Sequence, residues 1–150
     1  MDGVVVYGRY VLMSIKPVFT EEILSGFKKF EVRSKAGIIL RGDTIIIYAS
    51  APVKSVVGVF TAGRVTTLTH DELVRIHEQL QGVTERDLEF MKGRKRSLLI
   101  IEVLNPLRLD EPIHLGELRR WIPGFRPPVN YVRLRSESPL PALVLSKLRP

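Results

Sequence analysis

Short β-forming segments, each bounded by proline, glycine or a predicted helix, are the feature that most constrains how this chain folds. β-Branched and other apolar residues dominate segments 10–15, 29–34, 44–49, 53–64, 97–104 and 131–135, and residues 108–114 also look extended. Short helices are predicted at residues 20–26, 69–80, 84–91 and 116–121. Strands with helices inserted between them favour an α+β fold, a small β-barrel with helices at its side.

The length and composition of the chain suit one domain spanning residues 1–150. It has 150 residues, of which 45% are hydrophobic and 26% charged. A chain of this size buries about 68–70% of its unfolded surface, which is enough for a real core. The sequence contains no cysteine, which excludes disulfide bonds, thiolate metal ligands and thiol nucleophiles.

The charge balance points toward nucleic acid without establishing it. Lys and Arg outnumber Asp and Glu by 23 to 16, so the formal net charge is +7. A positive potential of this kind attracts nucleic acid, but many small basic proteins bind nothing specific. The chain has four residues with side-chain amides: Gln79, Gln81, Asn105 and Asn130. This scarcity, together with the absence of cysteine, is a thermophile-like composition.

Membrane, metal and cofactor signals are not found in the sequence. The apolar runs are far shorter than the ~20 residues that span a bilayer, and Asp2 stands where a signal peptide carries basic residues. We therefore expect a cytoplasmic protein with no membrane partner. The histidines His70, His77 and His114 are scattered, and no glycine-rich nucleotide loop occurs, so no metal and no cofactor are predicted.

Charged residues around the second predicted strand form the main candidate site. Glu31 and Arg33 are two residues apart and therefore lie side by side on one face of a strand. Lys28 comes just before them, and Lys16 ends the neighbouring strand. If those strands pair, the cations gather at one end of the barrel and can hold phosphate. The alternative is a surface strand with ordinary cross-strand ion pairs.

The string Gly-x-Lys-x-x-Glu-x-Arg at residues 26–33 resembles the motif of the ASCH domain, a branch of the PUA-like superfamily. The turn at 42–43, the strand end at 47–50 and the segment at 124–131 match that family in order and spacing. The resemblance implies a PUA-like β-barrel of five to six strands with flanking short helices. It also implies a cleft lined by the motif residues Lys28, Glu31 and Arg33, with Lys16 and Ser50 nearby.

Further basic and aromatic residues extend the predicted nucleic-acid-binding set. The run at 92–96 can contact phosphates, or it is a solvated loop that suppresses aggregation before a hydrophobic strand. Arginines interleave with aromatic residues near the C-terminus, where bases could stack, although Trp121 and Phe125 are expected to pack in the core. The added candidates are Lys54, Lys92, Arg94, Lys95, Arg96, Arg126 and Tyr131.

The resemblance implies RNA, or a modified nucleotide or nucleoside, as the ligand. We expect an RNA-binding protein for single-stranded, looped or modified RNA, in which Arg33 and Lys28 hold phosphate or a base edge and Glu31 accepts a base amine. One alternative is an amidohydrolase of acylated cytidine, with Lys28 and Glu31 as catalytic residues. Amidohydrolase members carry threonine where this chain has Glu31. A third alternative is a regulator that binds a small ligand or a partner.

Overall fold

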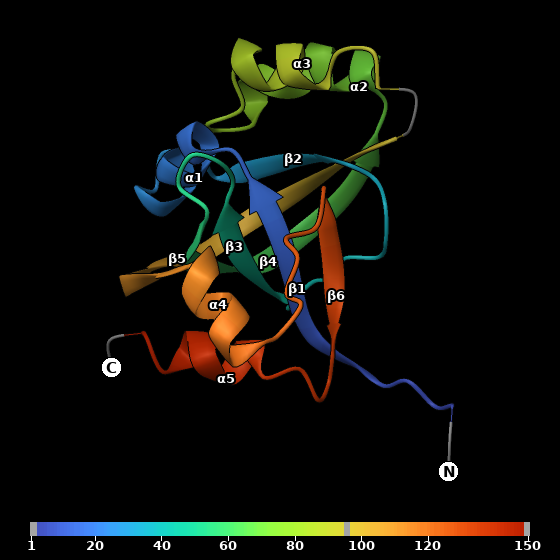
Figure 1. Ribbon diagram of the computed structural model, residues 1–150. Helices are drawn as coiled ribbons and strands as arrows, with labels where there is room; N and C mark the ends of the chain where they lie inside the picture. Colours follow the sequence, from blue (N-terminus) through green and yellow to red (C-terminus); the bar gives the residue numbers. More distant parts are fainter. Residues whose placement is uncertain (1–2, 95–96, 149–150) are drawn as a thin grey trace.

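The described residues form one six-stranded mixed sheet with helices at both of its ends (Figure 1). The computed structural model describes residues 3–94 and 97–148. The strands are β1 (Tyr7–Ile15), β2 (Phe30–Ser34), β3 (Thr44–Ala49), β4 (Ser55–Leu68), β5 (Leu98–His114) and β6 (Tyr131–Arg135). The helices are α1 (Pro17–Leu24), α2 (His70–Ile76), the 3₁₀ turn η1 (His77–Gln79), α3 (Glu85–Met91), α4 (Leu115–Trp121) and α5 (Leu140–Leu145).

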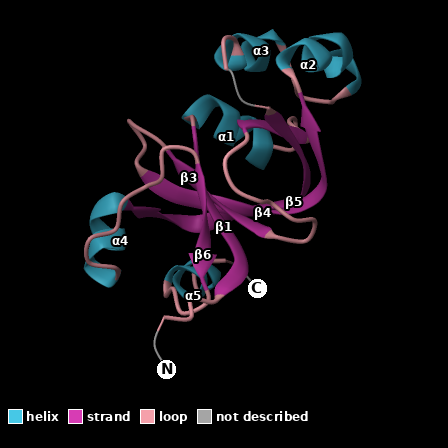
Figure 2. Cartoon of the chain, turned by 90° about the vertical axis from the view of Figure 1, so that its right-hand side faces the viewer, coloured by secondary structure: helices cyan, strands magenta, loops and turns pink. Residues whose placement is uncertain are grey.

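The sheet is open, which corrects the expected β-barrel. Its strand order is β2-β5-β4-β3-β1-β6, so β2 and β6 are edge strands and do not pair with each other in the described part of the chain. Among the described strand pairs, only β1 and β3 run parallel. The long strands β4 and β5 shift register at three places, and such bulges increase twist. The sheet therefore curls toward a barrel but stops short of closure (Figure 2). The α+β class is confirmed.

Alternating side chains let the central strands bury both faces. Ile45 and Ile47 of β3 join one core cluster inside the curl, and Ile46 between them joins a second cluster under α4 and α5. A third, smaller cluster packs Leu73 and Val83 of the helical segment against Val32 of β2. Burial on both faces explains why β3 reads as a continuous apolar run.

Helices α2 and α3 form an insert that leaves and re-enters the sheet at one point (Figure 1). The strands on either side of the insert, β4 and β5, pair up to Leu68 opposite Leu98. Thr69 and Thr84 cap the two helices with capping boxes, as their sequences predict. The sheet pairing closes the base of the insert, so the insert is supported by the sheet without interrupting it.

Several local expectations differ from the structure. Helix α1 begins at Pro17, because proline is favoured in the first turn of a helix, and not at Thr20. Trp121 is 62% exposed at the end of α4, whereas Phe125 is buried as expected. Helix α5 was not anticipated from the sequence. No helix in the described residues is long and apolar enough to cross a membrane.

Asp43 fastens the turn before β3 to the strands at one edge of the sheet. Its carboxylate is fully buried and accepts hydrogen bonds from Arg9 of β1, from Arg133 of β6 and from the backbone N–H of Leu40. Burial alone would raise the pKa of Asp43, but the bonds from Arg133, Leu40 and Arg9 together lower it below 3.8. The ionised carboxylate therefore stabilises the fold.

We expect Asp43→Asn to lower the free energy of unfolding at neutral pH by about 2–3 kcal/mol, because hydrogen bonds to a charged group are lost. The pKa of Asp43 is lower in the folded state than in the unfolded chain, so its contribution to the free energy of unfolding is complete above pH 3.8. The contribution is lost as the pH falls through the lower pKa of the folded state. The difference between the wild type and the variant should therefore shrink on acidification. Urea unfolding across an acid pH series measures it, and a constant difference would contradict the assignment.

Candidate functional site

The motif residues of β2 and of the turn before it form a buried charged network. Lys28 is 0% exposed and Glu31 is 1% exposed, and Arg33 is also buried. Glu31 and Arg33 share one face of β2, as the sequence predicts, while Val32 between them packs under the helical insert. The sequence did not predict that these three charged side chains are buried, because charged side chains on alternating strand positions are usually solvated.

Lys28 connects the network to the helical insert. Its ammonium group forms an ion pair with Asp87 of α3 and donates a hydrogen bond to the carbonyl of Gly82 at 3.3 Å. Gly82 has a φ of +89°, and a Cβ there would lie 2.3 Å from the Cα of Lys28. The same Asp87 carboxylate accepts the backbone N–H of Thr84 at the start of α3. Lys28 therefore holds α3 in place against β2.

Glu31 lies between the two buried cations. Its carboxylate is 4.0 Å from the Lys28 ammonium and 3.2 Å from Nη1 of Arg33. Burial raises the pKa of Glu31, Lys28 and Arg33 oppose that shift, and the nearby Asp87 adds to it. The cations Lys28 and Arg33 balance the charge of the carboxylates Glu31 and Asp87. The free-energy cost of burying these four groups is offset only while their ion pairs are intact.

Arg33 bridges the two edges of the open sheet. Its guanidinium donates to Glu31, to the carbonyl of Ser14 on β1 at 2.8 Å, and twice to Oδ1 of Asn130 just before β6. Nδ2 of Asn130 in turn donates to the carbonyl of Ser34 on β2 at 2.7 Å. Side chains thus connect β2 and β6 where no backbone ladder does. One of the five N–H groups of Arg33 and one of the two on Asn130 remain unused by described residues.

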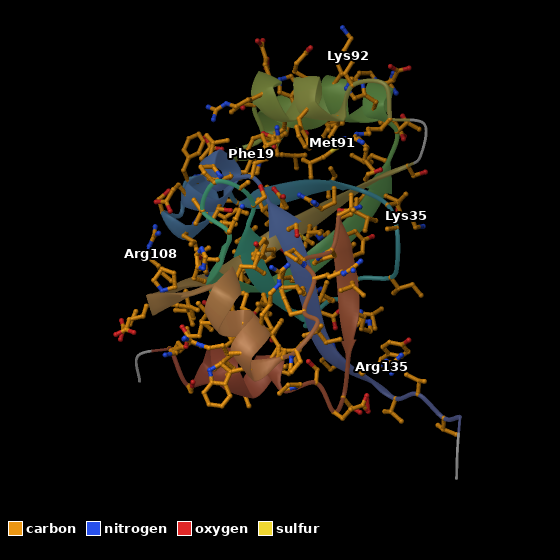
Figure 3. All side chains as sticks on the ribbon, in the orientation of Figure 1. Phe19, Lys35, Met91, Lys92, Arg108 and Arg135 are labelled. Atoms are coloured by element: carbon orange, nitrogen blue, oxygen red, sulfur yellow. The ribbon has the colours of Figure 1, made fainter. Side chains whose placement is uncertain are left out.

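A pocket of about 300 Å³ opens at this junction, which we call the seam pocket. Basic side chains border it, and no carboxylate does so among the described residues. Figure 3 shows Lys35 on the loop after β2, below Met91 of α3. The described lining residues are Arg33, Ser34, Lys35, Ala36, Phe90, Met91, Arg94, Val129 and Asn130.

Phe90 provides an aromatic surface at the rim of the seam pocket. The Lys16 ammonium lies 4.6 Å from the centroid of its ring, and the Arg94 guanidinium carbon lies 5.5 Å from it. Both distances are those of cation–π contacts. Phe90 belongs to α3, so the ion pair between Lys28 and Asp87 also helps to determine where this ring lies.

The remaining predicted site residues lie at varying distances from the seam pocket. Ser50 is beside Lys16, since its backbone N–H donates to the carbonyl of Ile15 at 2.9 Å. Lys54 and Arg126 are exposed on loops, and Lys92 is exposed at the end of α3. Lys95 and Arg96 lie outside the described residues.

Tyr131 is buried and has a structural position. Its hydroxyl donates to the carbonyl of Gly37 and accepts from the backbone N–H of Ala36 at 2.8 Å. These bonds hold the loop after β2 against the start of β6. The described residues contain no group of three or more His, Asp or Glu side chains placed to hold a metal ion.

Sequence reasoning missed three partners that complete the site. Asp87 lies 59 positions from Lys28, and Asn130 lies 97 positions from Arg33. Phe90 is likewise remote in the sequence from Lys16. Asp87 was visible only as a helix-capping residue. The segment 124–131 was singled out for its family resemblance, yet nothing local showed that its Asn130 would bind Arg33.

The comparisons with known proteins agree on one family. The model of the ASCH domain matches residues 13–112. The ASCH domain-containing ribonuclease of Zymomonas mobilis subsp. mobilis is 29% identical over 132 residues, which are 84% of each chain.

Solved structures support the fold. The crystal structure of ASCH from Zymomonas mobilis matches with a TM-score of 0.77 at 24% identity, covering 91% of this chain and 95% of that one. A tyrosine-to-phenylalanine mutant of the same protein gives 0.78 at 23% identity, covering 92% and 99%. The N-terminal domain of Staphylothermus marinus McrB gives 0.57 at 14% identity, covering 98% of each chain.

The buried network yields a stability prediction. We expect Lys28→Met to lower the free energy of unfolding by about 3–5 kcal/mol, because it leaves the Asp87 carboxylate buried without its cation. The double variant Lys28→Met/Asp87→Asn should lose clearly less, since the remaining amide is neutral and can still cap Thr84. Guanidinium unfolding of Lys28→Met, Asp87→Asn and the double variant measures this. A double variant as unstable as the sum of the single ones would contradict the pairing.

Proposed function

The chain belongs to the ASCH domain family, and from that membership we propose that it binds single-stranded RNA with one nucleotide in the seam pocket. The observation that carries the proposal is the convergence of unused N–H groups of Arg33 and Asn130 with a ring flanked by two cations. Such a site offers bonds to a base edge, a stacking surface and charge for phosphate.

Each part of the seam pocket has a role in this proposal. Arg33 and Asn130 donate to acceptor atoms of a base at the floor. Arg94 lies over Phe90 and presents its own planar face to a stacked base. Lys16 and Lys35 neutralise the flanking phosphates. A volume of about 300 Å³ suits one unpaired nucleotide, so a base must leave any duplex to enter.

Lys28 and Glu31 support the pocket from beneath in this proposal. Neither is among the described lining residues; they position Arg33 and α3. The exposed cations Lys54, Lys92 and Arg126 add positive charge along which an RNA strand continues. Ser50 lies beside Lys16, and Lys95 and Arg96 stay a sequence-based prediction.

The structure gives a reason against the amidohydrolase alternative. It needs the Lys28 amine at a substrate, and that amine is fully buried and paired with Asp87. RNA has independent support, because the Zymomonas mobilis relative is a ribonuclease and matches over 84% of each chain.

We expect Lys16→Ala/Arg94→Ala to weaken binding of a short single-stranded RNA and to reduce the slope of log affinity against log salt by about 0.7 for each phosphate contact removed. Both residues are surface cations, so the fold should persist. Fluorescence anisotropy across a salt series measures affinity and slope. The control Arg120→Ala removes an exposed charge on α4, away from the pocket. Equal losses in the control and the double variant would refute the seam pocket as the RNA site.

RNA cleavage is a second candidate function, favoured by the name of the Zymomonas mobilis relative. Cations at the pocket could stabilise the charge that develops on a phosphate during strand scission. We expect slow cleavage of single-stranded RNA, no cleavage of DNA of the same sequence, and at least a tenfold loss of rate in Lys16→Ala/Arg94→Ala. Gel analysis of end-labelled strands tests this. RNA that stays intact while it is bound would leave binding as the function.

A further inference from the structure

Three of the four side-chain amides of this protein gather in one surface depression. The chain contains only Gln79, Gln81, Asn105 and Asn130. The first three line a depression of about 470 Å³ between the insert and β5, which we call the amide pocket. The fourth amide lines the seam pocket. In a chain that otherwise lacks amides, every one of them therefore borders one of two concave sites.

The amides of the amide pocket are available for a ligand. Among the described residues, the side chains of Gln79, Gln81 and Asn105 have no hydrogen-bond partner, and each residue is exposed. Glu102 also lines the pocket; one of its carboxylate oxygens accepts the backbone N–H of Arg64 at 3.0 Å, and the other accepts no bond from a described residue. Lys29 adds an exposed cation at the border.

We propose that the amide pocket is a second nucleotide subsite and that it recognises adenine. An amide presents a donor and an acceptor side by side, which match the N6 amine and the neighbouring ring nitrogen of adenine. The free oxygen of Glu102 accepts from an exocyclic amine, which uracil lacks. Lys29 holds the adjoining phosphate.

The two pockets lie at opposite ends of β2. Lys29 and Phe30 border the amide pocket, and Arg33 and Ser34 border the seam pocket. At about 3.3 Å per residue, four steps along this strand cover about 13 Å, so one short RNA strand can occupy both. This subsite rests on the proposed RNA binding and adds base selection to it.

Two variants test the subsite without disturbing the fold. Gln79→Ala/Gln81→Ala removes both glutamine amides from exposed positions. Asn105→Gly removes the third amide and keeps its left-handed backbone, because φ is +48° there and glycine adopts that conformation freely. Ser136→Ala, at an exposed position that borders no pocket described here, is the control. Thermal unfolding verifies that each variant is folded.

The measurement is anisotropy with two labelled oligonucleotides at low salt: a short oligouridine, and the same strand with its central uridines replaced by adenosines. We expect the wild type and Ser136→Ala to bind the adenosine strand at least about fivefold more tightly, as one bidentate amide contact implies. Gln79→Ala/Gln81→Ala and Asn105→Gly should reduce or abolish this preference and keep the affinity for oligouridine.

The outcomes separate this inference from the proposed function. A wild type that binds both strands equally, or amide variants that keep the full preference, would overturn the adenine subsite and leave RNA binding intact. A wild type that binds neither strand at low salt would overturn both. Lys16→Ala/Arg94→Ala should weaken binding of both strands by the same factor and leave their ratio unchanged, because those cations contact phosphates and the rim of the other pocket.

Discussion

The rest of the site depends on the ion pair between Lys28 and Asp87, which joins a turn of the sheet to a helix of the insert. Because Lys28 is fully buried, the pair cannot exchange its partner for water. It fixes α3 against β2, and α3 carries Phe90 and Met91 to the seam pocket, with Arg94 just beyond the end of the helix. The same lysine faces Glu31, which orients Arg33. A substitution of Lys28, which does not line the pocket, would therefore disturb Arg33 and the α3 residues that do.

The seam pocket lies where the two edges of the unclosed sheet approach each other. Backbone ladders satisfy polar groups along the interior strands, but β2 and β6 come near each other without pairing. Arg33 and Asn130 supply the missing hydrogen bonds across that junction. Each of these two side chains keeps one N–H group that no described residue uses. The open edge of the sheet and the unused N–H groups beside the seam pocket thus have one cause.

Local sequence patterns predicted the elements better than their assembly. A continuous apolar run identified β3, alternation identified β6 and capping residues identified the two insert helices, since those signals lie within a few residues. The motif placed Glu31 and Arg33 on one face, but nothing near them showed that they would be buried, because the covering residues come from α3 and from the segment before β6. The barrel expectation failed for the same reason: closure depends on whether the two edges reach each other. Trp121 was expected in the core because a lone tryptophan usually is.

The insert between β4 and β5 has a consequence for how such a domain can diversify. Its two ends meet at the paired residues Leu68 and Leu98, so the strands on either side are already joined at its base. Residues can be added to or removed from the tip of the insert without altering the strand order, much as a loop tip tolerates insertion. The requirement that remains is an acidic group to meet Lys28. Such changes would alter the helical wall of the seam pocket while the six-stranded sheet stays the same.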